Sequence, residues 1–184
     1  MKRYLTICGI FFILFLVYPG NARSQYLKRS LNESAEVKTG ISSLTSHYRA
    51  LFGEGDNNSG IIRGLSRYGF LEIDAGGRGN EINPSDEELL LFICGGTGIL
   101  KYEKEQIPVA KNDFLYIPAG MEYSILNPRE QPLTLIMMGF KLSPGASDMI
   151  RKLMIANTDE VKLQTLPSHG PTTQFQRFHL ILPI

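Results

Sequence analysis

Two adjacent glutamates, Glu87 and Glu88, are the residue pair in this sequence best suited to acid–base chemistry. Neighbouring carboxyl groups can have their pKa values driven apart, so that one serves as an acid and the other as a base. Adjacent residues of a β-strand point to opposite faces, however, so only one of the two can enter a pocket. The alternative interpretation is that Asp86, Glu87 and Glu88 form the solvated start of a strand.

A second candidate for chemistry is the thiol of Cys94. Cys94 ends the apolar run 89–94, where a buried, unreactive thiol is the more common outcome. The other cysteine, Cys8, lies in the N-terminal apolar stretch, so Cys94 would be alone in a processed chain. One thiol cannot form an internal disulfide, and the fold must therefore depend on its core.

The first 24 residues have the layout of a secretory signal. Lys2 and Arg3 are followed by an apolar run over 7–18, and Ala22 and Ser24 are small residues at the positions that a signal peptidase reads. The run is about a dozen residues long, short of the roughly 20 that a bilayer span needs. We expect cleavage after Ser24 and export to the periplasm or the medium, without stable membrane insertion. An uncleaved anchor is the alternative.

The charge balance gives no reason to expect a nucleic-acid partner. Three of the 19 basic residues and none of the 18 acidic residues lie in 1–24, which leaves 16 against 18 and a net charge of about −2 after cleavage. Hydrophobic residues make up 43% and charged residues 20% of the chain, which is enough for a packed core.

Short apolar runs separated by turn residues predict an all-β domain. The chain has 18 glycines and ten prolines, and the turn residues fall at intervals typical of a sandwich or closed barrel. The expected strands are 61–66, 68–74, 88–94, 98–103, 106–109, 114–117, 122–126 and 133–141.

Helices are expected only on either side of these strands. Leu44, Tyr48 and Leu51 share one side of a predicted helix over 43–52, and a second helix is expected over 146–155. The expected organisation is a signal over 1–24, an N-terminal extension over 25–60, a barrel over 61–142 and a C-terminal helix and tail over 143–184.

The stretch 112–127 resembles the second conserved motif of the cupin superfamily. That motif contains Pro-x-Gly, a metal-binding histidine and a later asparagine, and Pro118, Gly120 and Asn127 match it in order and spacing. Asn112 replaces the leading glycine of the motif, and Tyr123 stands in the place of the histidine. The resemblance implies an all-β, RmlC-like double-stranded jelly-roll barrel, here with short N- and C-terminal helical extensions.

The stretch 77–98 resembles the first cupin motif, mainly through a glutamate, a strand and a glycine. Aligning Glu88 and Gly95 places Glu81 and Asn83 at the two histidine positions. A turn at Gly96 and Gly98 would shift the register by one, which leaves either Glu87 or Glu88 as the acid. The resemblance implies pocket candidates Glu81, Asn83, Glu88 and Tyr123.

These four side chains stand at the places where the family usually has three histidines and one glutamate to hold a metal, and of the four only Glu88 keeps the usual residue type. A neutral amide and a phenol with a pKa near 10 are poor ligands for transition metals. We expect no cofactor and no tightly bound metal, with an oxygen-bound divalent cation as the alternative. His47, His169 and His179 lie outside both motifs, and we interpret them as surface or capping residues.

The resemblance leaves three functional hypotheses. The first is an exported cupin that binds a small polar ligand without a transition metal. The second is an enzyme, either a metal-dependent oxygenase or isomerase or a metal-free catalyst that uses Glu88 and Tyr123. The third is a scaffold that needs a second barrel to be complete. Dimerisation could supply that barrel, with 133–140 as an apolar edge. Alternatively the chain is the first half of a bicupin, since 152–160 with 168–171 resembles a connector between two barrels.

Overall fold

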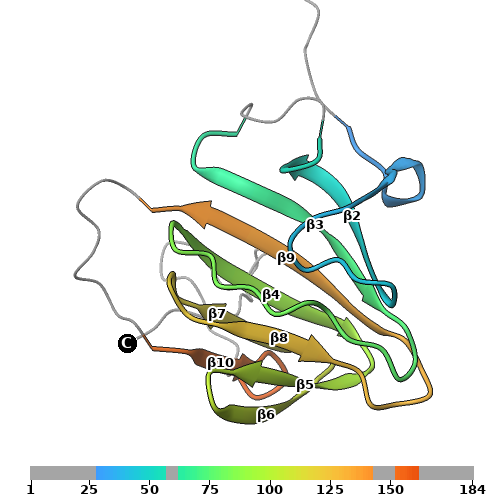
Figure 1. Ribbon diagram of the computed structural model, residues 1–184, viewed down its shortest axis with the longest axis vertical. Helices are drawn as coiled ribbons and strands as arrows, with labels where there is room; N and C mark the ends of the chain where they lie inside the picture. The colour runs from blue at the N-terminus through green and yellow to red at the C-terminus, as the bar shows by residue number, and fades with distance from the viewer. Residues whose placement is uncertain (1–27, 57–61, 143–151, 162–184) are drawn as a thin grey trace, which may run out of the picture.

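A computed structural model describes residues 28–56, 62–142 and 152–161, which form two β-sheets (Figure 1). The larger sheet has seven strands in the order β1-β2-β3-β9-β4-β7-β10, and the smaller has the order β6-β5-β8. All neighbouring strands are antiparallel. The strands of the larger sheet are β1 (Glu36–Val37), β2 (Ser46–Gly53), β3 (Leu65–Ile73), β9 (Leu133–Lys141), β4 (Glu87–Gly95), β7 (Asp113–Ile117) and β10 (Met154–Asn157). The smaller sheet contains β6 (Glu105–Ala110), β5 (Thr97–Tyr102) and β8 (Tyr123–Leu126).

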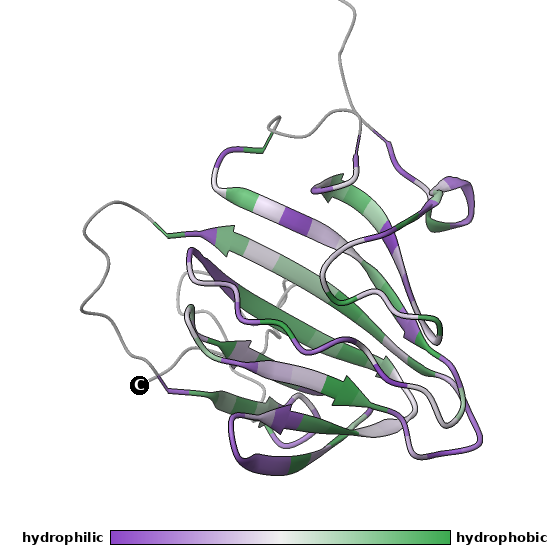
Figure 2. Cartoon of the chain, viewed as in Figure 1, coloured by the Kyte–Doolittle hydropathy of each residue, from purple (hydrophilic) through white to green (hydrophobic). Residues whose placement is uncertain are grey.

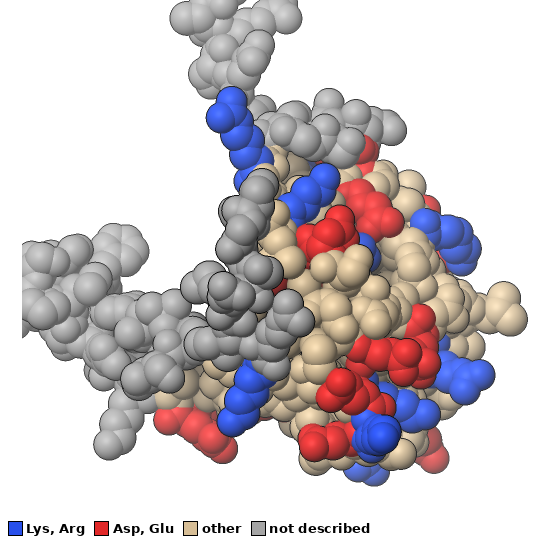
Figure 3. Space-filling model, turned by 60° about the vertical axis from the view of Figure 1, so that its left-hand side comes forward, with Lys and Arg blue, Asp and Glu red and all other residues tan. Residues whose placement is uncertain are grey.

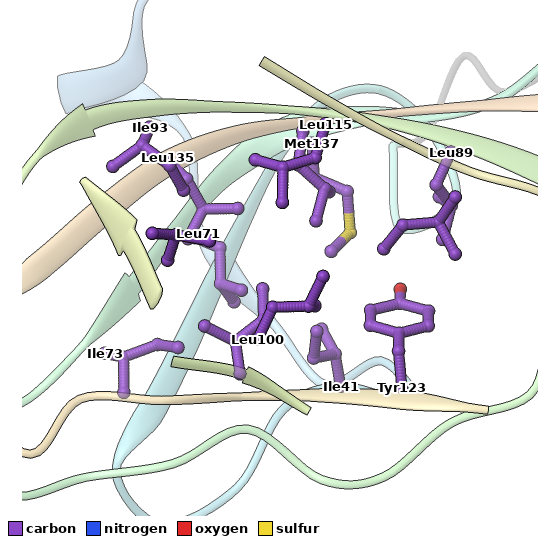
Figure 4. Close-up of a cluster of buried hydrophobic side chains, with 14 of the residues drawn as sticks. Ile41, Leu71, Ile73, Leu89, Ile93, Leu100, Leu115, Tyr123, Leu135 and Met137 are labelled. Atoms are coloured by element: carbon purple, nitrogen blue, oxygen red, sulfur yellow. The ribbon is translucent and has the colours of Figure 1, made fainter. Parts of the chain in front are cut away.

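The core lies between the two sheets. Alternate residues of each strand face inward, as the pleat requires, and the inward residues are almost all aliphatic. Figure 4 shows side chains of the larger sheet, including Leu89 and Met137, meeting Leu100 and Tyr123 from the smaller sheet. Each such aliphatic side chain contributes roughly 1.5–3 kcal/mol when it is fully buried. Over the described residues this core is not cross-linked by a disulfide, since Cys94 is a free thiol there.

The all-β architecture predicted from the turn spacing is confirmed. The expected strands 61–66 and 68–74 are a single strand, β3, with a register shift between Leu65 and Arg67 where it pairs with β9. The remaining six expected strands match β4 to β9 to within one residue at each end.

The helix predicted over 43–52 is wrong, because this segment forms β2. Tyr48 and Ser46 are buried in alternation, and β2 pairs with β3 over most of its length. Leu44, which the helical spacing placed on the apolar side, is 94% exposed. Pairing with an available neighbouring strand has therefore overridden a helix-like spacing of apolar residues.

The other expected helix falls largely outside the described residues. Positions 143–151 are not described, and Met154–Asn157 at the end of the expected helix forms β10, which pairs with β7. Within the described ranges the helical structure is limited to the 3-10 turn Leu31–Glu33, and no helix there is long and apolar enough to cross a membrane. Because β1, β2 and β10 pair into the larger sheet, that sheet extends beyond the expected barrel limits of 61 and 142 on both sides.

Two asparagines of the cupin-like stretch 112–127 have clear structural roles. Asn112 has φ 73°, a left-handed conformation that glycine adopts freely and that asparagine tolerates better than most residues. Asn127 is 1% exposed, and its Nδ2 donates to the carbonyls of Ile73 (3.0 Å), Asp74 (2.9 Å) and Gln131 (2.8 Å). Asn127 thus ties the β8–β9 connection to the end of β3.

Candidate functional site

The structure does not bring the four predicted pocket residues together. Tyr123 on β8 is 1% exposed and points into the core, whereas Glu81 and Asn83 are exposed. The reason is the bridge between Ile82 and Tyr123, in which Ile82 packs against the core. Its two neighbours must then point the opposite way, toward solvent.

Glu88 lies on the outer face of the larger sheet. It follows the inward-facing Glu87 on β4, and its Oε1 accepts a hydrogen bond of 2.8 Å from the Tyr116 hydroxyl. Burial, and then the Glu88 carboxylate, raise the pKa of Tyr116 to about 12. Glu88 and Tyr123 therefore lie on opposite sides of the sheet, and the structure gives no support to an acid–base pair formed by these two residues.

The acid that enters the barrel is Glu87, which forms a buried ion pair with Arg67 of β3. Arg67 Nε lies 2.8 Å from Glu87 Oε1, and the two side chains are 12% and 5% exposed. Ser66 Oγ donates a hydrogen bond to the same carboxylate oxygen. Arg67 Nη2 also lies 2.9 Å from Glu54 Oε2, at the end of β2. The Arg67 guanidinium thus binds two carboxylates, the buried one of Glu87 and the more exposed one of Glu54.

Glycines leave the space that this polar cluster occupies. A Cβ on Gly139 of β9 would collide with Glu87 Oε1, and it would lie 2.6 Å from Ser66 Oγ. On β3, a Cβ on Gly69 would lie 2.5 Å from the hydroxyl of Tyr48. Side chains at either position would displace the ion pair or the phenol beside it.

The Arg67–Glu87 pair forms part of the wall of an open pocket of about 500 Å³ at one end of the barrel. The charged groups of its lining are three acids and two bases. The lining residues are Gly53, Glu54, Leu65, Ser66, Arg67, Asp86, Glu87 and Lys141. Acidic and basic side chains are also interspersed over the side of the molecule in Figure 3.

Three buried hydrogen-bond donors near this pair have no partner among the residues that the structure describes: Arg67 Nη1, the Tyr48 hydroxyl and the Tyr123 hydroxyl. Burial is the main cause that raises the pKa of both tyrosines far above the usual value, so both phenols keep their protons. Both phenols also experience the charges of Arg67 and Glu87. Figure 4 shows the Tyr123 hydroxyl directed toward Leu89, the inward residue next to Glu87 on β4. A buried donor without a partner costs roughly 1–3 kcal/mol.

Sequence reasoning missed Arg67 and Tyr48, and it left open whether Glu87 or Glu88 faces inward. Residues 89–93 are all apolar, so no alternation of polar and apolar residues indicated which glutamate faces inward. Arg67 and Tyr48 lie on β3 and β2, outside both cupin-like stretches. Arg67 lay between the two predicted strands 61–66 and 68–74, so no feature of the sequence indicated that this arginine faces a buried acid.

His47 lies apart from this cluster, on the outer side of β2. Its Nδ1 is 3.1 Å from Glu36 Oε1, and its Nε2 is 3.2 Å from Asp74 Oδ2. These two hydrogen bonds, the one to Glu36 first, raise the pKa of His47. His47 thus links β1 to the end of β3, while His169 and His179 lie outside the described residues.

The inward residues do not fit the usual cupin metal set. Within 28–56, 62–142 and 152–161, no group of three or more histidine, cysteine, aspartate or glutamate side chains could hold a metal ion. Glu87 is already paired with a guanidinium, which competes directly with a cation. Tyr123 keeps its proton because burial raises its pKa. The cluster therefore presents mainly N–H and O–H groups, whereas each ligand of a metal ion must supply a free electron pair.

Comparison with solved structures identifies the fold. The chain is similar to a predicted oxalate decarboxylase from Thermotoga maritima, with a TM-score of 0.54 and 13% identity over 63% of this chain and 100% of that one. It is also similar to the bacterial pirin YhhW from Escherichia coli in complex with nickel(II), with a TM-score of 0.59 and 18% identity over 74% and 59% of the two chains.

A third similar structure is a Cupin 2 conserved barrel domain protein from Salinispora arenicola, with a TM-score of 0.50 and 14% identity over 64% of this chain and 90% of that one. No family model matches the sequence, and no curated protein matches it. The resemblance first seen in Pro118, Gly120 and Asn127 is therefore confirmed at the level of three-dimensional structure: the chain has the fold of the cupin superfamily.

Proposed function

We propose that this cupin-fold protein binds a small polar molecule at the Arg67–Glu87 end of the barrel, without a tightly bound transition metal. The observation that carries the proposal is a set of three buried donors to which no described residue supplies an acceptor, namely Arg67 Nη1 and the hydroxyls of Tyr48 and Tyr123. Of these three residues Arg67 lines the open pocket, and a buried donor is satisfied when a ligand that reaches it supplies an acceptor.

The charges of the pocket favour an uncharged ligand. Glu54 and Glu87 already share the Arg67 guanidinium, and Asp86 adds a third acid against Lys141. An anion with several charges would meet these carboxylates, whereas carbonyl, amide or polyol oxygens accept hydrogen bonds without that repulsion. The ligand class that fits is a small neutral carbonyl compound or polyol.

The proposal is tested by calorimetric titration with a panel of neutral polyols and carbonyl compounds, monocarboxylates and amines. Tyr123→Phe removes one donor and keeps the ring, so it should weaken the best neutral ligand about five- to tenfold, the equivalent of one hydrogen bond. Tyr102→Phe is the matched control, because the Tyr102 hydroxyl is also buried without a side-chain partner among the described residues, but burial and the nearby Glu103 and Glu105 are what raise its pKa. No neutral ligand in the panel, or equal weakening by both variants, would contradict the proposal.

We further propose that residues 1–24 direct export and are removed. The support is the basic start, the apolar run 7–18 and the small residues Ala22 and Ser24. When the complete chain is expressed in a bacterium and the cells are fractionated, the exported product should begin at Gln25. Recovery of a product that still begins at Met1 would contradict export by cleavage.

A further inference from the structure

A second pocket opens between two connections of the barrel, the one from β1 to β2 (38–45) and the one from β3 to β4 (74–86). Its volume is about 590 Å³, within the usual range of small-molecule pockets. Figure 2 shows both connections mostly in purple and white, interrupted by short green stretches. The lining consists of Lys38, Leu44, Arg78, Asn80 and three hydroxyl residues of the 38–45 connection. Among the described residues, no acidic side chain contributes to this lining.

Hydrogen bonds hold the two connections together beside this pocket. Ser43 Oγ donates to the carbonyl of Arg78 at 2.6 Å, and the backbone N–H of Arg78 donates to Thr45 Oγ1 at 3.0 Å. Gly77 permits this close approach, because a Cβ there would lie 2.8 Å from the Cβ of Thr45. The backbone of Arg78 is therefore held in place, while its side chain is exposed.

The pocket presents two cations and an amide. In the part of the chain that the structure describes, no acidic residue forms an ion pair with Arg78. Lys38 Nζ lies 3.1 Å from Glu36 Oε1, but Glu36 is not part of the lining. Asn80 Nδ2 donates to the carbonyl of Ser42 at 2.6 Å, which uses one of its two N–H groups. Positive charge is thus concentrated at this pocket, in contrast to the pocket beside Arg67.

Leu44 adds apolar surface to the same pocket. It is 94% exposed, the largest exposed fraction among the large apolar side chains of the described residues. A ligand that contacts both Arg78 and Leu44 would remove this surface from water, which favours binding. The pocket therefore matches a molecule that has an anionic end and an apolar end.

We propose that this pocket binds a small organic anion, with its carboxylate or phosphate group held by Arg78 and Lys38 and its apolar part against Leu44. A guanidinium can donate two parallel hydrogen bonds to either kind of anionic group, and the ammonium adds a second positive charge. The site is independent of the Arg67–Glu87 pocket, because the two pockets lie at opposite ends of β2 and β3.

The test is calorimetric titration of the complete chain with hexyl phosphate and with hexanoate at low ionic strength. Both compounds should bind, and added salt should weaken their binding because the cations are exposed. Inorganic phosphate carries only the anionic end and hexanol only the apolar end. Each of these two should bind at least about fivefold more weakly than hexyl phosphate.

Substitutions then assign the binding to this pocket. Arg78→Gln should weaken the binding of hexyl phosphate about tenfold, because a charged donor is lost. Arg63→Gln is the matched control, since Arg63 is exposed and lines neither pocket, and it should leave the affinity unchanged. Leu44→Ser should remove the advantage of hexyl phosphate over inorganic phosphate.

The absence of binding by both organic anions would overturn the proposal, and so would equal weakening by Arg78→Gln and Arg63→Gln. Equal affinities of wild type for hexyl phosphate and inorganic phosphate would also contradict it, because Leu44 would then contact no ligand. Vesicles of phosphatidylglycerol provide the last comparison. If the protein bound these vesicles but not hexyl phosphate, the two connections would contact a membrane surface and the proposed small-molecule site would be wrong.

Discussion

Arg67→Met should destabilise the protein by about 3–5 kcal/mol, since it leaves a buried carboxylate without its counter-charge. The Glu87 side chain is 5% exposed, and Arg67 is its only cationic partner among the described residues. Ser66 alone would remain as a donor to Glu87. The free energy of unfolding from urea denaturation measures the effect.

The control for this prediction is the exposed ion pair between Lys38 and Glu36, whose side chains are 74% and 39% exposed. Lys38→Met should change the free energy of unfolding by no more than about 0.5 kcal/mol. The double variant Arg67→Met, Glu87→Gln should recover much of the lost stability, because it removes the unpaired charge together with its partner. A single variant as stable as the wild type would mean that Glu87 does not carry a buried charge.

Asn127→Ala should lower the free energy of unfolding by on the order of 3 kcal/mol, because three backbone carbonyl groups share the Asn127 amide as their hydrogen-bond donor. The Asn127 amide donates to Ile73, Asp74 and Gln131, and its Oδ1 accepts from the backbone N–H of Arg129 at 3.1 Å. An alanine offers none of these bonds and leaves a cavity. Thermal and urea unfolding should both show the loss.

Asn83→Ala is the matched control for this variant, because Asn83 is exposed. Its change in the free energy of unfolding should stay within about 0.5 kcal/mol. If the two asparagine variants were equally stable, Asn127 would not hold the β8–β9 connection to β3 as described. The asparagine of the cupin-like motif would then need an explanation other than stability.

The strands were predictable because turn residues mark their ends. Gly120 has φ 77° and Asn112 has φ 73°, conformations that few other residue types adopt. Strand β7 begins directly after Asn112, and the turn at Gly120 separates β7 from β8, as expected. The segment 43–52 was predicted as a helix because Leu44, Tyr48 and Leu51 have helical spacing. Spacing alone does not reveal that a neighbouring strand is free to pair.

The site was harder to predict, because the strand that carries Glu87 and Glu88 is apolar on both of its faces. Where both faces of a strand are apolar, as in 89–93, the sequence carries no period of two to set the direction of Glu87 and Glu88. The resemblance to cupin motifs located Tyr123 in the interior, but its two possible registers left either Glu87 or Glu88 as the acid, and the pocket candidates took Glu88. Arg67 and Tyr48 come from strands distant in the sequence, and only the tertiary structure brings them beside Glu87.

The central claim is that the buried donors around Arg67 receive a ligand, and fluorine NMR of the protein labelled with 3-fluorotyrosine tests it most directly. On addition of the best neutral ligand, the resonances of Tyr48 and Tyr123 should shift, while those of Tyr102 and Tyr116 should stay within experimental error. Shifts confined to tyrosines outside the Arg67–Glu87 cluster would contradict the claim.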